Sequence, residues 1–209
     1  MFPLGTVLLP GMLLPLHVFE PRYRALVRDC LAADEPDFGV VLIERGSEVG
    51  GGDVRTGIGT RARILRAEEQ PDGRFGVVAA GLARLRVRAW LDDDPYPRAD
   101  VEDWPDAGDA PGARAEATEA LGPGGEVTVL LRRAAALVTE LGDTAAPVDL
   151  ELADDPEMAS YQAAAVAPLG PVDRQLLLAA PSVAARVAAL ADLLPGAIEL
   201  LGARLSDPG

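Results

Sequence analysis

The spacing of apolar residues changes once along this chain, near residue 106, and that change restricts the folds the chain can adopt. Up to that point, short apolar or alternating runs separated by Pro and Gly predict strands with a single helix. Beyond it, apolar residues recur every three or four positions, which is typical of helices. Residues 106–112 (DAGDAPG) have the composition of a linker. We therefore predict an α+β protein of two lobes: residues 1–108, rich in strands, and residues 109–209, a helical lobe packed on the first.

The first lobe is expected to contain short strands and one helix. Residues 6–9 and 13–18 are apolar runs on either side of Pro10-Gly11, which is a turn signal. Apolar side chains then recur at helical spacing, so a helix should begin at Pro21. The other expected elements are strands at residues 38–43, 61–66, 74–80 and 82–90, a turn at residues 71–73 (PDG) and a flexible loop at residues 50–53.

The second lobe is expected to be a helical bundle. Apolar stripes predict helices over residues 114–121, 126–141, 156–167, 172–180 and 182–194. Pro195-Gly196 should break or kink the last of them, because a proline inside a helix lacks an N–H and clashes with the preceding turn.

The residue inventory excludes most kinds of active site. The chain contains no Lys, one His and one Cys, which rules out a P-loop, a Schiff-base lysine and a zinc site built within one chain. His17 lies between apolar neighbours and is expected to be structural, and Cys30 on the apolar helix stripe is expected to be an inert thiol. The acidic runs at residues 92–94 and 154–155 are expected at solvated turns or helix starts. We therefore predict no catalytic residues, no cofactor and no metal site.

The net charge of −14 limits the partners of the chain. An acidic surface repels phosphate backbones and anionic lipids, which disfavours nucleic acid and membrane as partners. A single cysteine fits a reducing compartment. The apolar start has no basic region and is interrupted by prolines, so it does not have the pattern of a signal peptide, and the chain has no apolar run long enough to span a membrane. We expect a soluble cytoplasmic protein.

Aromatic residues mark the end of the first lobe. Trp90, Tyr96 and Trp104 lie there, and together with Met12 they are our candidate anchors for a protein partner. Packing into the core is the alternative interpretation for the two tryptophans.

Alternation over residues 82–90 predicts a half-buried strand with Arg84, Arg86 and Arg88 on its outer face. With Arg61 and Arg63 these residues could form a basic face for RNA. The alternative is a solvent-facing surface paired with local acids, which the acidic net charge favours.

Residues 2–31, FPLGTVLLPGMLLPLHVFEPRYRALVRDCL, resemble the opening of the Lon amino-terminal domain family, the substrate-recognition part of the ATP-dependent Lon proteases. The segments FGVVLIERGSEVG, VRTGIGTRARI, DGRFGVVAAGLARLRV and PYPRADVE follow in the order of the family, and a weaker likeness continues through DDPEMASYQAAA and DRQLLLAAPSVAARVAAL. The resemblance implies a β-rich lobe, a distorted barrel of the PUA-like type, followed by a helical bundle. It also implies a binding domain without catalytic residues, here as a stand-alone domain lacking the ATPase and protease parts.

The leading hypothesis is a non-catalytic module that recognises other proteins or peptides, including unfolded or damaged clients. Binding would use an apolar groove, or a peptide strand added to an open sheet edge. The alternatives are a structural or regulatory subunit with a dedicated protein partner, a homodimer, and an RNA-binding PUA-like module.

Overall fold

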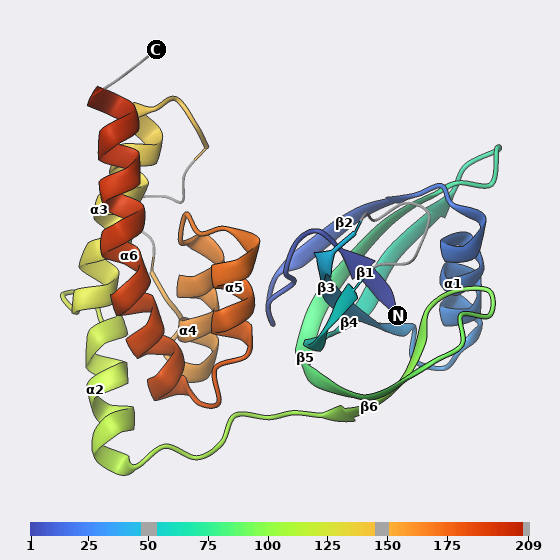
Figure 1. The fold of residues 1–209 in the computed structure, drawn as a ribbon, viewed down its shortest axis with the longest axis horizontal. Helices are drawn as coiled ribbons and strands as arrows, with labels where there is room; N and C mark the ends of the chain where they lie inside the picture. The colour runs from blue at the N-terminus through green and yellow to red at the C-terminus, as the bar shows by residue number, and fades with distance from the viewer. Residues whose placement is uncertain (47–53, 145–150, 207–209) are drawn as a thin grey trace. The chain divides into compact units, whose positions relative to one another are not determined.

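The computed structural model describes residues 1–46, 54–144 and 151–206, and the chain divides into two compact units, Met1–Pro105 and Asp106–Gly209 (Figure 1). The Gly-rich loop expected at residues 50–53 lies outside the described residues. Over the residues that the structure describes, strands occur in the first unit, where they form a curled half-barrel, and the second unit contains helices, which confirms the expected α+β fold. Among the described residues, no helix is long and apolar enough to cross a membrane.

One sheet of six strands forms the first unit. Its strands are β1 (Phe2–Leu4), β2 (Leu13–Val18), β3 (Asp37–Arg45), β4 (Val54–Glu69), β5 (Phe75–Leu91) and β6 (Arg98–Asp103), and its helix is α1 (Pro21–Ala32). The strand order is β1-β3-β4-β5-β2, and β6 also pairs with β5. The β1–β3 pair is parallel and the other pairs are antiparallel.

The expected hairpin is present, but its strands are longer than the local pattern indicated. The expected strands at residues 74–80 and 82–90 are a single strand, β5, which runs through Gly81. β4 and β5 pair along most of their length, with register shifts between Arg61 and Ala62 and between Ile64 and Arg66. Such irregularities increase twist and bend a sheet, which is how two long strands curl around one core.

The prediction of a strand at residues 6–9 is wrong. That run is not in the sheet, although Val7, Leu8 and Leu9 are buried, and the short strand β1 precedes it. The run passes close over β5, since a Cβ added at Gly81 would lie 2.5 Å from the carbonyl oxygen of Leu9. The apolar residues of this run therefore signalled burial, and not a strand.

The helices of the second unit are α2 (Pro111–Leu121), α3 (Glu126–Glu140), α4 (Pro156–Val166), α5 (Pro171–Leu178) and α6 (Val183–Ser206). α6 contacts each of the other four helices. Pro195 does not break the last helix, because α6, which is 24 residues long, runs through it. Leu194 and Ile198 on either side of the proline are buried, so packing offsets the one backbone hydrogen bond that Pro195 cannot make.

The segment expected to be a linker is bonded to the helices of the second unit. The Asp106 carboxylate lies 2.6 Å from a guanidinium nitrogen of Arg186, whose side chain is fully buried. The backbone N–H of Ala107 donates to the carbonyl of Pro181, and the Asp109 carboxylate accepts from the backbone N–H of Ala184 at the start of α6. The boundary expected after residue 108 therefore falls inside the second unit.

Candidate functional site

The two end strands of the sheet, β1 and β2, line one cavity of about 180 Å³. Its residues are Phe2 and Leu4 of β1, Pro15, Leu16, His17 and Val18 of β2, and Phe19, Glu20 and Tyr23 at the start of α1. Because strands at opposite ends of the sheet share this cavity, the sheet must curl until its edges face each other. We call this cavity the seam.

The inner wall of the seam is aromatic. The rings of Phe2 and Tyr23 are stacked, with centroids 4.2 Å apart and planes inclined by 12°, and behind this wall the Phe38 ring is tilted against Phe2 at 6.1 Å between centroids. These rings are buried in the core of the first unit. At the mouth, Phe19 keeps 55 % of its surface exposed. An apolar side chain that enters the seam would therefore meet ring surfaces and leave water.

A charged pair lies beside the mouth. The Arg22 guanidinium is 3.1 Å from the Glu20 carboxylate and also covers the outer face of the Tyr23 ring at 4.5 Å. An apolar pocket with a polar rim is the usual anatomy of a protein-binding site.

Both strands beside the seam carry a proline, Pro3 in β1 and Pro15 in β2. Gly81 of β5 donates to the carbonyl of Met12, so in the alternating antiparallel ladder Leu14 and Leu16 bond toward β5 and Pro15 points to the open edge. A proline there offers no N–H to a further strand. The arrangement disfavours strand addition at this edge and favours recognition through side chains.

The candidate anchors Met12 and Tyr96 are partly buried and pack against the core of the first unit. The Tyr96 hydroxyl donates to the Asp29 carboxylate at 2.7 Å, which ties the β5–β6 turn to α1. Burial, followed by this hydrogen bond and the charge of Asp29, raises the pKa of Tyr96 to about 12. Tyr96 therefore has a structural contact in place.

The candidate anchors Trp90 and Trp104 each have a guanidinium over the ring. Arg55 lies 4.8 Å from the Trp90 ring centroid, and Arg84 and Arg86 lie 4.3 and 4.8 Å from that of Trp104. Trp90 pairs with Ala99 of β6, whereas Trp104 follows β6 five residues later, a separation of about 17 Å at about 3.3 Å per residue. The two tryptophans therefore lie at different points along β6 and contact different arginines.

The predicted outer position of Arg84 is wrong. This side chain is 3 % exposed, because Trp104 covers it and donates its backbone N–H to the Arg84 carbonyl. Trp104 continues the pairing of β6 with β5 by one residue, and the local pattern of β5 does not contain this contact.

The other arginines of the proposed RNA face lie beside carboxylates. Arg63 is 2.6 Å from Asp37, and its hydrogen bond holds the pKa of that carboxyl below its usual range. Arg61 lies 3.7 Å from Asp103. Arg86 and Arg88 share Glu102, at 3.9 and 3.1 Å. These pairs match the interpretation of a solvent-facing surface neutralised by local acids.

His17 is exposed on β2, contrary to the expectation of a structural histidine held among apolar neighbours, because Leu14 and Val18 take the inward positions. Cys30 is half-buried and its Sγ lies 3.3 Å from the Asp37 carbonyl oxygen. Burial raises the pKa of the Cys30 thiol, which agrees with an inert cysteine. In the described ranges, no three His, Cys, Asp or Glu residues are grouped so that they could hold a metal ion.

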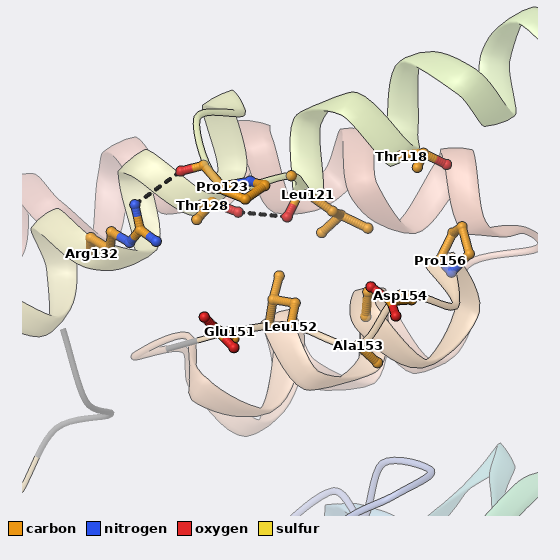
Figure 2. Close-up of a pocket in the computed structure, with 12 residues that line it drawn as sticks. Thr118, Leu121, Pro123, Thr128, Arg132, Glu151, Leu152, Ala153, Asp154 and Pro156 are labelled. Atoms are coloured by element: carbon orange, nitrogen blue, oxygen red, sulfur yellow. Dashed lines mark hydrogen bonds between the residues drawn. The ribbon is translucent and has the colours of Figure 1, made fainter. Parts of the chain in front are cut away.

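The second unit contains a larger cavity, of about 470 Å³, that sequence reasoning did not identify (Figure 2). Its walls come from the end of α2, the α2–α3 turn, α3, and the segment that leads into α4. The labelled residues in Figure 2 show Arg132 and Glu151 at one end of this cavity and Asp154 and Pro156 toward the other. Only a tertiary structure brings these segments together.

The family model of the ATP-dependent protease La (LON) substrate-binding domain matches residues 1–195. A Lon protease of Anaeromyxobacter dehalogenans is 34 % identical over 100 residues, which is 47 % of this chain and 12 % of that protein. Lon protease 1 of Herpetosiphon aurantiacus is 26 % identical over 95 % of this chain and 24 % of its own length. The chain thus spans about a quarter or less of these curated relatives.

Two solved structures have the same fold. A Lon N-terminal domain protein from Xanthomonas campestris is 27 % identical and superposes with a TM-score of 0.59, over 93 % of this chain and 95 % of that one. The N-terminal domain of a Mycobacterium avium complex Lon protease is 20 % identical, with a TM-score of 0.61 over 92 % and 96 %.

Proposed function

Because the chain belongs to the family of ATP-dependent protease La (LON) substrate-binding domains, we propose that it is a non-catalytic substrate-recognition module for exposed apolar segments of other proteins, unfolded ones included. The observation that carries the proposal is the seam between β1 and β2, an apolar cavity with an aromatic wall and a charged rim.

The size and edges of the seam support side-chain capture. Its 180 Å³ is below the range of about 300–1,000 Å³ that is usual for small-molecule and cofactor sites, and suits one or two apolar side chains. Pro3 and Pro15 have no N–H to donate to a strand of another chain, which disfavours extension of the sheet there. Such a site would bind many different apolar segments, because binding would not depend on one register of backbone hydrogen bonds. A receptor for unfolded chains requires this tolerance.

The residue inventory supports the non-catalytic part of the proposal. The chain has no Lys, and its one His and one Cys are on different elements, with the cysteine thiol facing a backbone carbonyl. A general base and a nucleophile arranged as a hydrolytic pair would require residues within hydrogen-bond reach of each other.

The test is a titration of fluorescein-labelled, reduced and carboxymethylated α-lactalbumin, and of its native form, with the purified chain, read by anisotropy. We expect selective binding of the unfolded form. Phe19→Ala should weaken it about fivefold to thirtyfold, as loss of an aromatic anchor does. Leu65→Ala, which truncates an exposed apolar residue of β4, is the matched control and should change affinity less than twofold.

Trp90→Ala and Trp104→Ala extend the test to the anchors named from the sequence. A loss confined to these two variants would move the client site from the seam to the β5–β6 hairpin. Binding of neither protein form by a chain shown to be folded would contradict client recognition and favour a dedicated partner.

A further inference from the structure

Side-chain to backbone hydrogen bonds connect the segments that form the walls of the cavity in the second unit. The Thr128 hydroxyl donates to the Leu121 carbonyl at 2.8 Å, and an Arg132 Nη donates to the Pro123 carbonyl at 2.9 Å, so α3 holds the α2–α3 turn on one side (Figure 2). On the other side, the Gln162 side chain accepts from the backbone N–H of Ala153 at 2.7 Å. These hydrogen bonds tie the segments that form the walls to the neighbouring helices.

Two carboxylates lie on the wall that precedes α4. Glu151 and Asp154 both line the cavity and both are exposed. The next residue, Asp155, uses its carboxylate to cap α4, accepting from the backbone N–H of Met158 at 2.9 Å. Asp154 precedes the N-cap residue of α4, and it lines the cavity.

Arg132 stands on the facing wall. One of its terminal nitrogens is engaged with Pro123, while its Nε is buried without a hydrogen-bond partner among the described residues. The cavity therefore offers carboxylate acceptors for a cation at one wall, and the terminal guanidinium nitrogens of Arg132 at the other.

Apolar surface fills the space between the polar groups. Leu121, Pro123, Leu152, Pro156 and Ala159 line the cavity with the polar residues. The whole second unit carries 16 acidic residues against six arginines, so its field favours a cationic occupant. At 470 Å³ the cavity lies within the range of ligand pockets.

We propose that this cavity binds a basic side chain, Arg or Lys, of a peptide segment that also carries apolar residues. The aliphatic stem would lie along Leu121 and Leu152, the cationic head would reach Glu151 and Asp154, and a peptide carbonyl would accept from Arg132. The inference rests on the proposed function, and adds to it a second contact that selects clients by charge.

The experiment uses the full chain and two fluorescein-labelled peptides. One is Gly-Leu-Arg-Leu-Ala-Gly, and the other has citrulline, which has nearly the same shape but no charge, in place of Arg. We expect the Arg peptide to bind about threefold to tenfold more tightly than the citrulline peptide at 50 mM salt, with the difference shrinking at 500 mM.

The double variant Glu151→Gln/Asp154→Asn should abolish the preference for the Arg peptide. Asp192→Asn/Glu199→Gln, which removes two exposed carboxylates of α6, gives the same charge change and should retain it. Equal affinity for both peptides, or an equal loss of preference in both double variants, would overturn the inference.

The two proposals fail separately. Unfolded α-lactalbumin binding that depends on Phe19, together with equal peptide affinities, would leave the seam as client site and remove the basic-residue site. A preference for the Arg peptide that depends on Glu151 and Asp154, without α-lactalbumin binding, would leave the basic-residue site and remove client recognition at the seam.

Discussion

Arg186 and Asp106 form a buried ion pair, 2.6 Å apart, between the first turn of α6 and the first residue of the helical unit. The same guanidinium donates to the hydroxyls of Ser160 and Tyr161 and to the Leu177 carbonyl, and lies over the Tyr161 ring at 3.8 Å. One side chain thus connects α4, α5 and α6 with the chain that enters the unit.

Asp106→Ala should destabilise the helical unit by about 3–5 kcal/mol, because it leaves the Arg186 charge buried without its carboxylate. Urea unfolding followed by circular dichroism measures the change. Asp192→Ala, at an exposed position of α6, should stay within about 0.5 kcal/mol of the parent. Equal midpoints for the two variants would show that the pair does not support the unit.

Gly81→Ala should destabilise the strand unit by about 1–3 kcal/mol, since its Cβ would lie 2.5 Å from the Leu9 carbonyl oxygen and force the backbone apart. Gly76→Ala is a matched control in the same strand, where an added Cβ meets nothing within 4 Å. Thermal unfolding of the two variants should therefore differ, and a tolerated Gly81→Ala would contradict the close packing of residues 7–9 on β5.

Ionisation of the Tyr96 hydroxyl should destabilise the folded state at alkaline pH. Burial, followed by the hydrogen bond to Asp29, raises its folded pKa to about 12, above the usual value of 10, so the neutral phenol stabilises the fold fully below pH 10 and the contribution is lost as pH rises toward 12. Unfolding midpoints across pH 9–12 should fall more steeply for the parent than for Tyr96→Phe, which has no phenol to ionise. Parallel curves would refute the assignment.

Protonation of the Asp37 carboxylate should destabilise the folded state at acid pH. The hydrogen bond from Arg63 lowers its pKa, so the pair stabilises the fold above the usual carboxyl pKa, and the contribution is lost as pH falls through the lowered value. Arg63→Gln should therefore flatten the dependence of unfolding midpoint on pH below about pH 4. An unchanged acid profile would show that the pair does not couple to folding.

Pro15→Val should increase self-association relative to the parent. The substitution restores an N–H that points to the open edge of β2, and unprotected edges pair with one another. Light scattering over a range of concentrations detects it, and Pro21→Ala, at the start of α1, is the control. A Pro15→Val chain that associates no more than the control would remove the protective role from this proline.

Local patterns predicted most of the elements. The stripe after Pro21 became α1 and the turn at residues 71–73 became the β4–β5 hairpin, because spacing and turn chemistry act within a few residues. β1 was missed because a strand of three residues is recognisable only through its parallel partner, with Phe2 opposite Val40. The break expected at Pro195 is absent because buried neighbours outweigh one missing hydrogen bond.

Sequence by itself determined the change from a strand-rich to a helical part, the family resemblance and the exclusion of familiar catalytic chemistry, since periodicity, motif and inventory are properties of the chain. Tertiary structure alone decided where ligands could bind. The curl of the sheet brings Phe2 and Tyr23 together at the seam, and helix packing brings Leu121 and Asp154 together at the second cavity. Both depend on contacts between residues far apart in sequence, which no local pattern encodes.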